Sequence, residues 1–391
     1  NHIRSGEQVT DKRGIEEADE KFNIINLVCT GAMMKIFPCR NIAGKTLEWY
    51  SQSDQLPQDM DNDKWVFIRK SMSYVNEMIV MKKYNDACLL LEKIKKYQQK
   101  ECDGLLPADN KFKAEKIYNQ FDYSKSVAMA CICIGLICFI YYCHCMASQK
   151  RTSRKAIIIL NILLWIVFTY LSAAICLRGY VSNHLPLSNG FETMQFMAWC
   201  TLLLTFLLQR KFAMLLPFGF LLCGLTLMVS MLGESNPQIT QLMPVLQSPL
   251  LSIHVVVIMI AYSLLAFIML NGVTAVILHQ SQKECKEQIE RLQIISQIIL
   301  YPAIFLLAIG IFIGAVWANV SWGRYWGWDP KEVWALITML VYALALHPRS
   351  LPWFHRTMFF HVFCITAFIT VLITYFGVNF LLGGMHSYAN G

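Results

Sequence analysis

The sequence predicts an all-α polytopic membrane protein with about eight transmembrane helices and a soluble, mostly helical N-terminal domain. Of its 391 residues, 55% are hydrophobic and only 15% are charged. That composition excludes a disordered chain and is too apolar for an ordinary soluble enzyme. The charge is uneven, because residues 1–125 hold 19 of the 26 acidic and 20 of the 34 basic side chains. We therefore expect 1–125 to be a soluble domain and the rest to lie in a membrane.

The soluble part is expected to be helical mainly in its second half. Apolar residues recur at helical spacing from Lys64 to Lys100, and Gly104 with Pro107 predicts the end of that helix. The sequence opens at Asn1 without a signal-peptide pattern, which suggests part of a longer protein. Four cysteines of this part are candidates for disulfides if it faces an oxidising compartment: Cys29, Cys39, Cys88 and Cys102.

Eight apolar stretches follow, each near the roughly 20 residues that a helix needs to cross the hydrocarbon core. The first, with the basic loop after it, makes up residues 126–155, and the other seven fall within 156–391. The expected spans are 126–146, 156–177, 191–208, 212–232, 250–278, 297–318, 330–347 and 357–377.

Basic residues alternate sharply between the two sets of loops, and cytoplasmic loops carry the excess of Lys and Arg. The richer set holds Lys150, Arg151, Arg154, Lys155, Arg210, Lys211, Lys283, Lys286, Arg291, Arg349 and Arg356. The other set holds only Arg178, Arg324 and Lys331. We therefore expect a multi-pass membrane protein with the richer set of loops on the cytoplasmic side. Its N-terminal domain, its loop between the sixth and seventh spans and its C-terminal tail would be extracytoplasmic.

Residues 317–332 form a tryptophan-rich loop between the sixth and seventh spans, within the stretch SWGRYWGWDPKEVWALI. Part of it has a purely structural explanation. Asp329 can cap the following helix, Pro330 suits its first position, and Glu332 fits the third position of a capping box.

The tryptophans exceed what a membrane interface needs, since a belt requires only one or two anchors per helix end. Glycines among them let the backbone approach another group closely. This composition suits a broad, flat, apolar ligand, with a porphyrin favoured over a quinone. The residues concerned are Trp317, Trp322, Gly323, Trp326, Gly327 and Trp328.

A haem would need axial ligands, and iron favours imidazole. Of nine histidines, His254 lies near the outer end of the fifth span and His386 lies in the tail after the eighth. Both can reach the level of the tryptophan-rich loop. A lone membrane histidine is often only a hydrogen-bonded structural residue, but two that bracket an aromatic loop favour ligation.

Several segments, in order, resemble one family. The stretch WGRYWGWDPKEVWALITMLVYALALHPR is similar to the tryptophan-rich WWD signature of CcsA/ResC, the haem-handling subunit of system II cytochrome c biogenesis. LPLSNGFETMQFMAW, SPLLSIHVVVIMIAYSLL and TYFGVNFLLGGMHSYA resemble further motifs of that family. The resemblance covers about residues 156–389. The related CcmC and CcmF proteins fit less well, because their loops lack the following Lys-Glu-x-Trp-Ala-Leu-Ile.

The resemblance implies that haem b, as substrate and bound ligand, is held through its iron by His254 and His386. It also implies that His347, at the cytoplasmic end of the seventh span, meets haem arriving from inside. The haem platform would consist of Trp322, Gly323, Trp326, Trp328, Asp329 and Pro330. No catalytic residue is assigned, because Glu192 and Glu234 are weak candidates for a general base.

The implied function is delivery and presentation of haem for covalent attachment to a C-x-x-C-H apocytochrome c. The chain would then be the haem-handling part of a thioether-forming cytochrome c synthase. The implied partners are a CcsB/ResB-like membrane protein, separate or fused upstream, thioredoxin-like thiol-reducing proteins and membrane lipid. No basic face with interleaved aromatics indicates nucleic acid. The role of residues 1–125 stays unassigned.

Two other functions remain open: a haem exporter or chaperone without ligation activity, and a transmembrane haem or quinone electron carrier. An electron carrier would place paired histidines in the middle of facing helices. The Cys-His-Cys run at 143–145 is not expected to bind a metal, because successive helical residues point in different directions.

Overall fold

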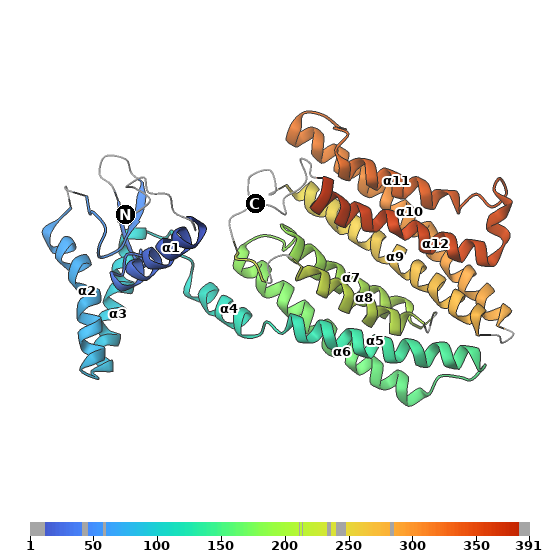
Figure 1. Ribbon diagram of the computed structural model, residues 1–391, viewed down its shortest axis with the longest axis horizontal. Coiled ribbons are helices and arrows are strands. Elements are labelled where there is room, and N and C mark those ends of the chain that lie inside the picture. The colour runs from blue at the N-terminus through green and yellow to red at the C-terminus, as the bar shows by residue number, and fades with distance from the viewer. Residues whose placement is uncertain are drawn as a thin grey trace. The chain divides into compact units, whose positions relative to one another are not determined.

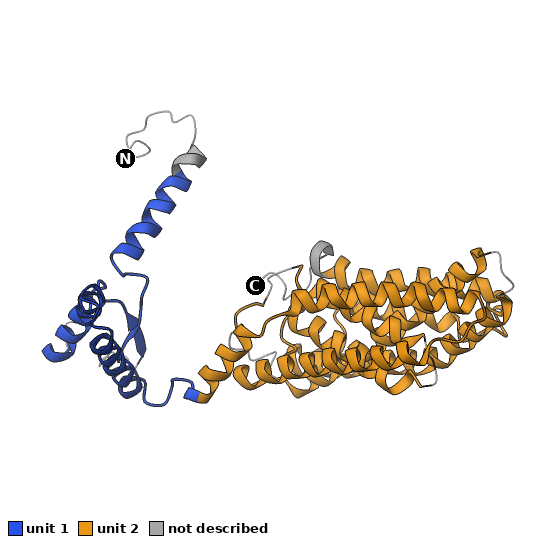
Figure 2. Ribbon diagram, turned by 90° about the horizontal axis from the view of Figure 1, so that it is seen from below, with its two compact units in different colours: residues 1–109 blue, residues 110–391 orange. Residues whose placement is uncertain are grey.

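The computed structural model forms two compact units, Asn1–Asp109 and Asn110–Gly391 (Figure 2). The structure describes residues 12–40, 46–57, 60–210, 212, 214–232, 236–239, 248–281 and 285–382.

The first unit combines helices with one small hairpin. Helices α2 and α3 pack against each other, and the antiparallel hairpin pairs Phe37 with Tyr50. Phe37, Ile68, Val75 and Ile94 form its small core. The elements are α1 (Lys12–Cys29), β1 (Phe37–Arg40), β2 (Leu47–Tyr50), α2 (Asn62–Val80) and α3 (Tyr84–Cys102).

The single helix expected from Lys64 to Lys100 is wrong, because the chain turns between α2 and α3. Lys82 has a φ of 59° there, in the left-handed region, which interrupts a helix. The second helix ends as expected, since Asp103 is left-handed at its C-cap and Gly104 follows at a φ of 83°. The hairpin was not expected, but it leaves the all-α class unchanged.

The four cysteines proposed for disulfides are free thiols in the structure. Cys39 and Cys102 are buried, whereas Cys29 and Cys88 are exposed. Burial raises the pKa of the Cys39 and Cys102 thiols, so both are less reactive than exposed thiols at neutral pH.

The second unit begins with α4 and continues as a bundle of apolar helices (Figure 1). An apolar helix lies at each of the eight expected places, which confirms a polytopic all-α membrane protein. Its elements are α4 (Asp109–Gln120), α5 (Ser124–Ala147), α6 (Arg154–Ser182), α7 (Gly190–Leu208), α8 (Leu215–Ser230), α9 (Pro249–Gln280), α10 (Lys286–Trp322), α11 (Pro330–Leu344), the short 3-10 helix η2 (Pro352–His355), α12 (Thr357–Leu372) and the π-helical η3 (Ile373–Leu382).

Length separates these apolar helices into two groups. Six in the described part of the chain are long and apolar enough to cross a bilayer: α5, α6, α7, α9, α10 and Thr357–Val378. Helices α8 and α11 have only 16 and 15 residues. At 1.5 Å per residue, 15 residues extend for about 22 Å.

Helix α10 begins eleven residues before the expected span. The additional turns carry a Glu287–Arg291 ion pair at i,i+4 spacing, which supports a helix outside an apolar region. A search for apolar length alone misses such a polar extension.

Helix α9 is the central element of the half that carries the tryptophan-rich loop. It packs along α10 on one side and α12 on another, and it also contacts α7. Gly272 allows the close approach of α12, since a Cβ there would lie 2.8 Å from the His361 carbonyl oxygen. His361 itself is fully buried, and its Nε2 lies 3.2 Å from the Ile289 carbonyl oxygen.

The expected helix from Pro330 to His347 is three residues too long. Helix α11 ends at Leu344, and His347 is exposed beyond it, with Nδ1 2.9 Å from the Ala343 carbonyl oxygen.

The side chains of the Cys-His-Cys run at 143–145 lie on different faces of α5: Cys143 and Cys145 are buried, and His144 is exposed.

Candidate functional site

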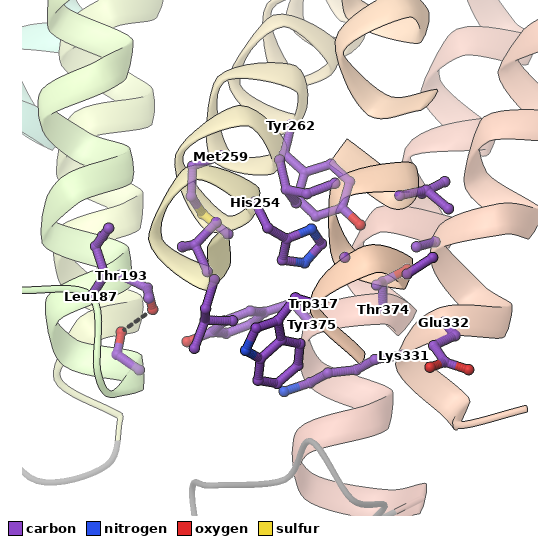
Figure 3. A pocket seen from close by; sticks show the side chains of 18 of the residues that line it. Leu187, Thr193, His254, Met259, Tyr262, Trp317, Lys331, Glu332, Thr374 and Tyr375 are labelled. Atoms are coloured by element: carbon purple, nitrogen blue, oxygen red, sulfur yellow. Dashed lines mark hydrogen bonds between the residues drawn. The ribbon is translucent and has the colours of Figure 1, made fainter. Parts of the chain in front are cut away.

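A cavity of about 260 Å³ lies at the end of the bundle that carries the tryptophan-rich loop (Figure 3). Its walls come from the start of α7, from α9 and α10, from the loop itself, and from α11 and η3. Most of the lining is apolar or aromatic. The polar side chains among the lining residues include His254, Tyr262, Lys331, Glu332, Thr374 and Tyr375.

His254 reaches into this cavity from the second turn of α9. Its Nδ1 lies 2.7 Å from the carbonyl oxygen of Gly310 on α10. A carbonyl oxygen only accepts hydrogen bonds, so Nδ1 must carry the proton. In the neutral ring, Nε2 is then the nitrogen with the lone pair. Histidines that bind metals commonly have their second nitrogen held in this way.

Gly314 leaves the space that the His254 ring fills. A Cβ at position 314 would lie 2.7 Å from Cε1 and 2.8 Å from Nδ1 of His254, closer than real Cβ contacts allow. Gly310, one turn away, similarly makes room for Ile258. The two glycines therefore let α10 pack closely against α9 and fix where the imidazole lies.

The tryptophan-rich loop is held by the first turn of α11. Asp329 and Glu332 form the expected capping box, with Pro330 at the first helical position. Glu332 Oε2 also accepts the backbone N–H groups of Gly327, at 2.8 Å, and Asp329, at 3.2 Å. The Glu332 carboxylate thus holds the backbone of the loop by hydrogen bonds to the residues before and after Trp328.

Trp328, between these two hydrogen bonds, adopts a φ of 56°. This left-handed conformation is unusual for a bulky residue and persists only where its surroundings enforce it. Its side chain is 77% exposed. Helix α10 ends at Trp322, and the φ of 73° at its C-cap, Gly323, is typical of a glycine that terminates a helix.

The four tryptophans form two edge-to-face pairs. Trp317 is buried with its ring centroid 4.8 Å from that of Trp322, and Trp326 lies 6.1 Å from Trp328. Trp317 and Trp326 line the cavity, whereas Trp322 and Trp328 are not among its lining residues. The expected platform residues therefore lie in different environments.

The wall formed by residues 187–190 depends on a buried ion pair. Glu192 Oε1 accepts from Arg178 Nε at 2.6 Å, and both side chains are almost fully buried. The other oxygen, Oε2, accepts from the backbone N–H and hydroxyl of Ser188, at 2.8 and 2.6 Å. Arg178 further donates to Asn236 and to the Pro237 carbonyl. Glu192 is thus a structural anion rather than a general base facing the cavity.

Other expected site residues lie elsewhere. His386 and Glu234 lie outside the described residues. His347 lies beyond the far end of α11, away from this cavity. No three His, Cys, Asp or Glu side chains group as a metal site within the ranges that the structure describes.

Sequence reasoning missed several residues that line or support the cavity. Lys331 and Arg178 were counted only as loop charges, although Lys331 directly follows the Asp-Pro pair. No local pattern marks Thr374 and Tyr375, which line the cavity from the π-helical η3. Such wide turns occur frequently at functional sites.

The model of the cytochrome C assembly protein family matches residues 187–386, which include His254 and the tryptophan-rich loop. This chain belongs to that family. The match confirms the resemblance to CcsA/ResC and a role in cytochrome c biogenesis.

Named relatives agree with this assignment. The chain is 31% identical over 379 residues to protein NrfI of Wolinella succinogenes, covering 96% of this chain and 42% of NrfI. It is 35% identical over 253 residues to the cytochrome c biogenesis protein CcsA of Chlamydomonas reinhardtii, covering 62% of this chain and 71% of that protein. CcsA of Prochlorococcus marinus is 31% identical over 276 residues, with 62% and 87% covered. This member of the family therefore spans less than half the length of NrfI.

Breaking the buried Arg178–Glu192 pair should destabilise the protein. Arg178→Met leaves the Glu192 carboxylate buried without its cation, at a cost of about 3–5 kcal/mol. We expect a clear fall in the midpoint of thermal unfolding in detergent. Arg291→Met, which removes the cation of an exposed ion pair, should change the midpoint little. Equal midpoints for the two variants would contradict a structural role of the buried pair.

Proposed function

We propose that this chain binds haem b at the His254 cavity and presents it for covalent attachment to an apocytochrome c. The observation that supports this most strongly is the hydrogen bond of His254 Nδ1 to Gly310, because it leaves the lone pair of the neutral ring on Nε2, the form of imidazole that binds iron. Aromatic and aliphatic walls around that ring suit a flat, apolar macrocycle. The family assignment supports the same reading.

The residues present fit a haem. His254 would supply one axial nitrogen, and Trp317 and Trp326 would supply apolar contacts to the ring. We propose His386 as the second axial ligand, as the family resemblance implies. When bound, haem supplies vinyl carbons that can form thioethers with two cysteine thiols. The protein's own task is then to bind, orient and keep water away, which makes a slow bimolecular step effectively unimolecular.

The proposed setting is a bacterial cytoplasmic membrane, as the family resemblance implies, and the distribution of loop charges supports an outward-facing tryptophan-rich loop. Proposed partners are a CcsB/ResB-like membrane protein, a C-x-x-C-H apocytochrome c and thioredoxin-like proteins that keep its cysteines reduced. Residues 1–125 would be an extracytoplasmic domain. Trp328, exposed next to the cavity-lining Trp326, is available to contact such a partner.

A haem exporter or chaperone without ligation activity would use the same cavity. A transmembrane electron carrier fits less well, because His254 lies in the second turn of its helix rather than mid-span. Covalent haem on a C-x-x-C-H acceptor distinguishes ligation from export.

Replacing His254 with Gly should lower both the haem bound and the covalent haem transferred to a co-expressed C-x-x-C-H acceptor. The vacated position can take free imidazole, so added imidazole should restore a large part of both. His279→Gly is the matched control, because His279 is exposed on the same helix, far from the cavity. The measurements are the haem absorption spectrum and haem-stained acceptor. A His254→Gly protein with the spectrum and activity of the parent would remove His254 from the proposed site.

We further propose that His347 meets haem from the cytoplasmic side. His347→Ala should then reduce haem at the His254 site several-fold while the protein folds normally. His355→Ala serves as the control, because His355 is exposed at the end of η2. Bound haem is measured after purification, together with the unfolding midpoint. Normal haem content in His347→Ala would show that His347 has no role in haem entry, and its hydrogen bond with Ala343 would then be only structural.

A further inference from the structure

Helix α1 of the first unit is exposed along its length, although its C-terminal half is apolar. Every residue from Glu16 to Cys29 is exposed, and the helix extends away from the other elements of this unit (Figure 2). The exposed apolar side chains of this half are Phe22, Ile24, Ile25, Leu27 and Val28, and Phe22 is 67% exposed. Such a cluster of large apolar side chains in solvent indicates an interaction surface.

A helix of this length and composition needs a packing partner. Helix α1 has 18 residues, little more than the length below which even alanine-rich helices are marginal in water. The β-branched Ile24, Ile25 and Val28 lower its helix propensity further. The core of this unit, formed around Phe37 and Ile68, includes no residue of α1 in the described part of the chain. Most of the stability of α1 must therefore come from contacts that this chain does not supply.

The distribution of apolar side chains around α1 indicates a groove. From Phe22 to Cys29 the only polar amides are Asn23 and Asn26, which lie three positions apart and so share one side of the helix. The apolar side chains cover most of the remaining circumference. A helix that lies flat on a bilayer has one apolar face, and a coiled-coil seam is a narrow stripe. A helix that is apolar nearly all round is normally enclosed by protein.

The charges of α1 also disfavour a lipid surface. The two turns before Phe22 carry four carboxylates, at Glu16, Glu17, Asp19 and Glu20. Glu17 pairs with Lys21 at 3.8 Å. Interfacial helices are instead rich in lysine and arginine, because they face anionic lipids. The partner of α1 should therefore have basic residues beside an apolar groove.

The similarity to NrfI favours a protein domain as this partner. The alignment covers 96% of this chain, so it includes most of the first unit, but only 42% of NrfI. In NrfI the matching segment is therefore part of a polypeptide more than twice as long. A second protein part of considerable size thus accompanies this unit in a relative.

We propose that α1 inserts into an apolar groove of an extracytoplasmic domain of the CcsB/ResB-like partner, whether separate or fused. This is a helix-in-groove interface, in which Phe22 and Ile25 are the central anchors and the carboxylates of the first turns face a basic rim. The identity of the partner rests on the proposed function, whereas the need for a groove follows from α1 itself.

Photo-crosslinking identifies what covers α1. The photoreactive residue benzoylphenylalanine replaces Phe22 in the full chain, which is co-expressed with a ResB-like protein and irradiated in the membrane. We expect a covalent adduct with the ResB-like polypeptide, located by mass spectrometry of its peptides. The same probe at Tyr84 is the matched control, because Tyr84 is an aromatic residue of the same unit and is 59% exposed on α3. It should give no adduct at that groove.

Limited trypsin digestion measures the protection of α1 independently. Lys21 is exposed within the helix, and a helix bound in a groove is cut only from its unbound fraction. Cleavage after Lys21 should be at least about tenfold slower in membranes that contain the partner than in the chain alone.

Ile25→Asp should abolish this protection, because it would bury an unpaired carboxylate in the groove. Its unfolding midpoint should match that of the parent, since Ile25 is exposed in this chain. Val80→Asp is the control, because Val80 is 75% exposed at the end of α2. That variant should keep the protection.

Three results would overturn the inference. They are a Phe22 probe that reacts only with lipid or with a second copy of this chain, a Phe22 probe that reacts with the partner no more than the Tyr84 probe, and equal cleavage after Lys21 with and without the partner. None of them bears on haem at His254, which the His254→Gly experiment tests separately.

Discussion

The hydrogen bond between His254 Nδ1 and the Gly310 carbonyl oxygen is the interaction on which the site depends. It exists because α9 and α10 pack closely enough for a side chain of one to reach the backbone of the other. Gly310 and Gly314 provide that approach. The bond fixes both the ring orientation and the tautomer of His254. The close packing of α9 and α10 therefore determines which imidazole nitrogen carries the lone pair.

A second constraint acts on the loop beside it. Glu332 holds the backbone at Gly327 and Asp329, which encloses the left-handed Trp328 between two hydrogen bonds. The same carboxylate completes the capping box of α11. The residues that start the helix therefore also shape the loop, and the loop cannot rearrange without loss of the cap. The opposite wall is held in a comparable way by Glu192 and Arg178.

Local chemistry explains what could be predicted from the sequence. Apolar periodicity located the helices of the bundle, and the Asp-Pro-x-Glu pattern predicted the capping box, because both depend on neighbouring residues. Contacts between distant segments could not be predicted in this way. The His254–Gly310 bond joins residues 56 positions apart, and the Arg178 network joins four separate segments through Tyr118, Glu192 and Asn236. The position of Lys331 in the cavity depends on where α11 lies against η3, which no local pattern encodes.

The spectrum of bound haem in Gly314→Ala, compared with Gly224→Ala, tests the His254 site most directly. Each substitution adds one methyl group to a close contact between two helices, α9–α10 for Gly314 and α5–α8 for Gly224, with a packing cost of about 1–3 kcal/mol. The methyl at 314 would collide with the His254 ring, whereas the methyl at 224 would meet Ile132, which does not line the cavity. Gly314→Ala should therefore weaken haem binding and alter the axial-ligand spectrum, while Gly224→Ala should keep the parental spectrum. Parental spectra in both variants, or equal changes in both, would contradict the central role of the His254 ring.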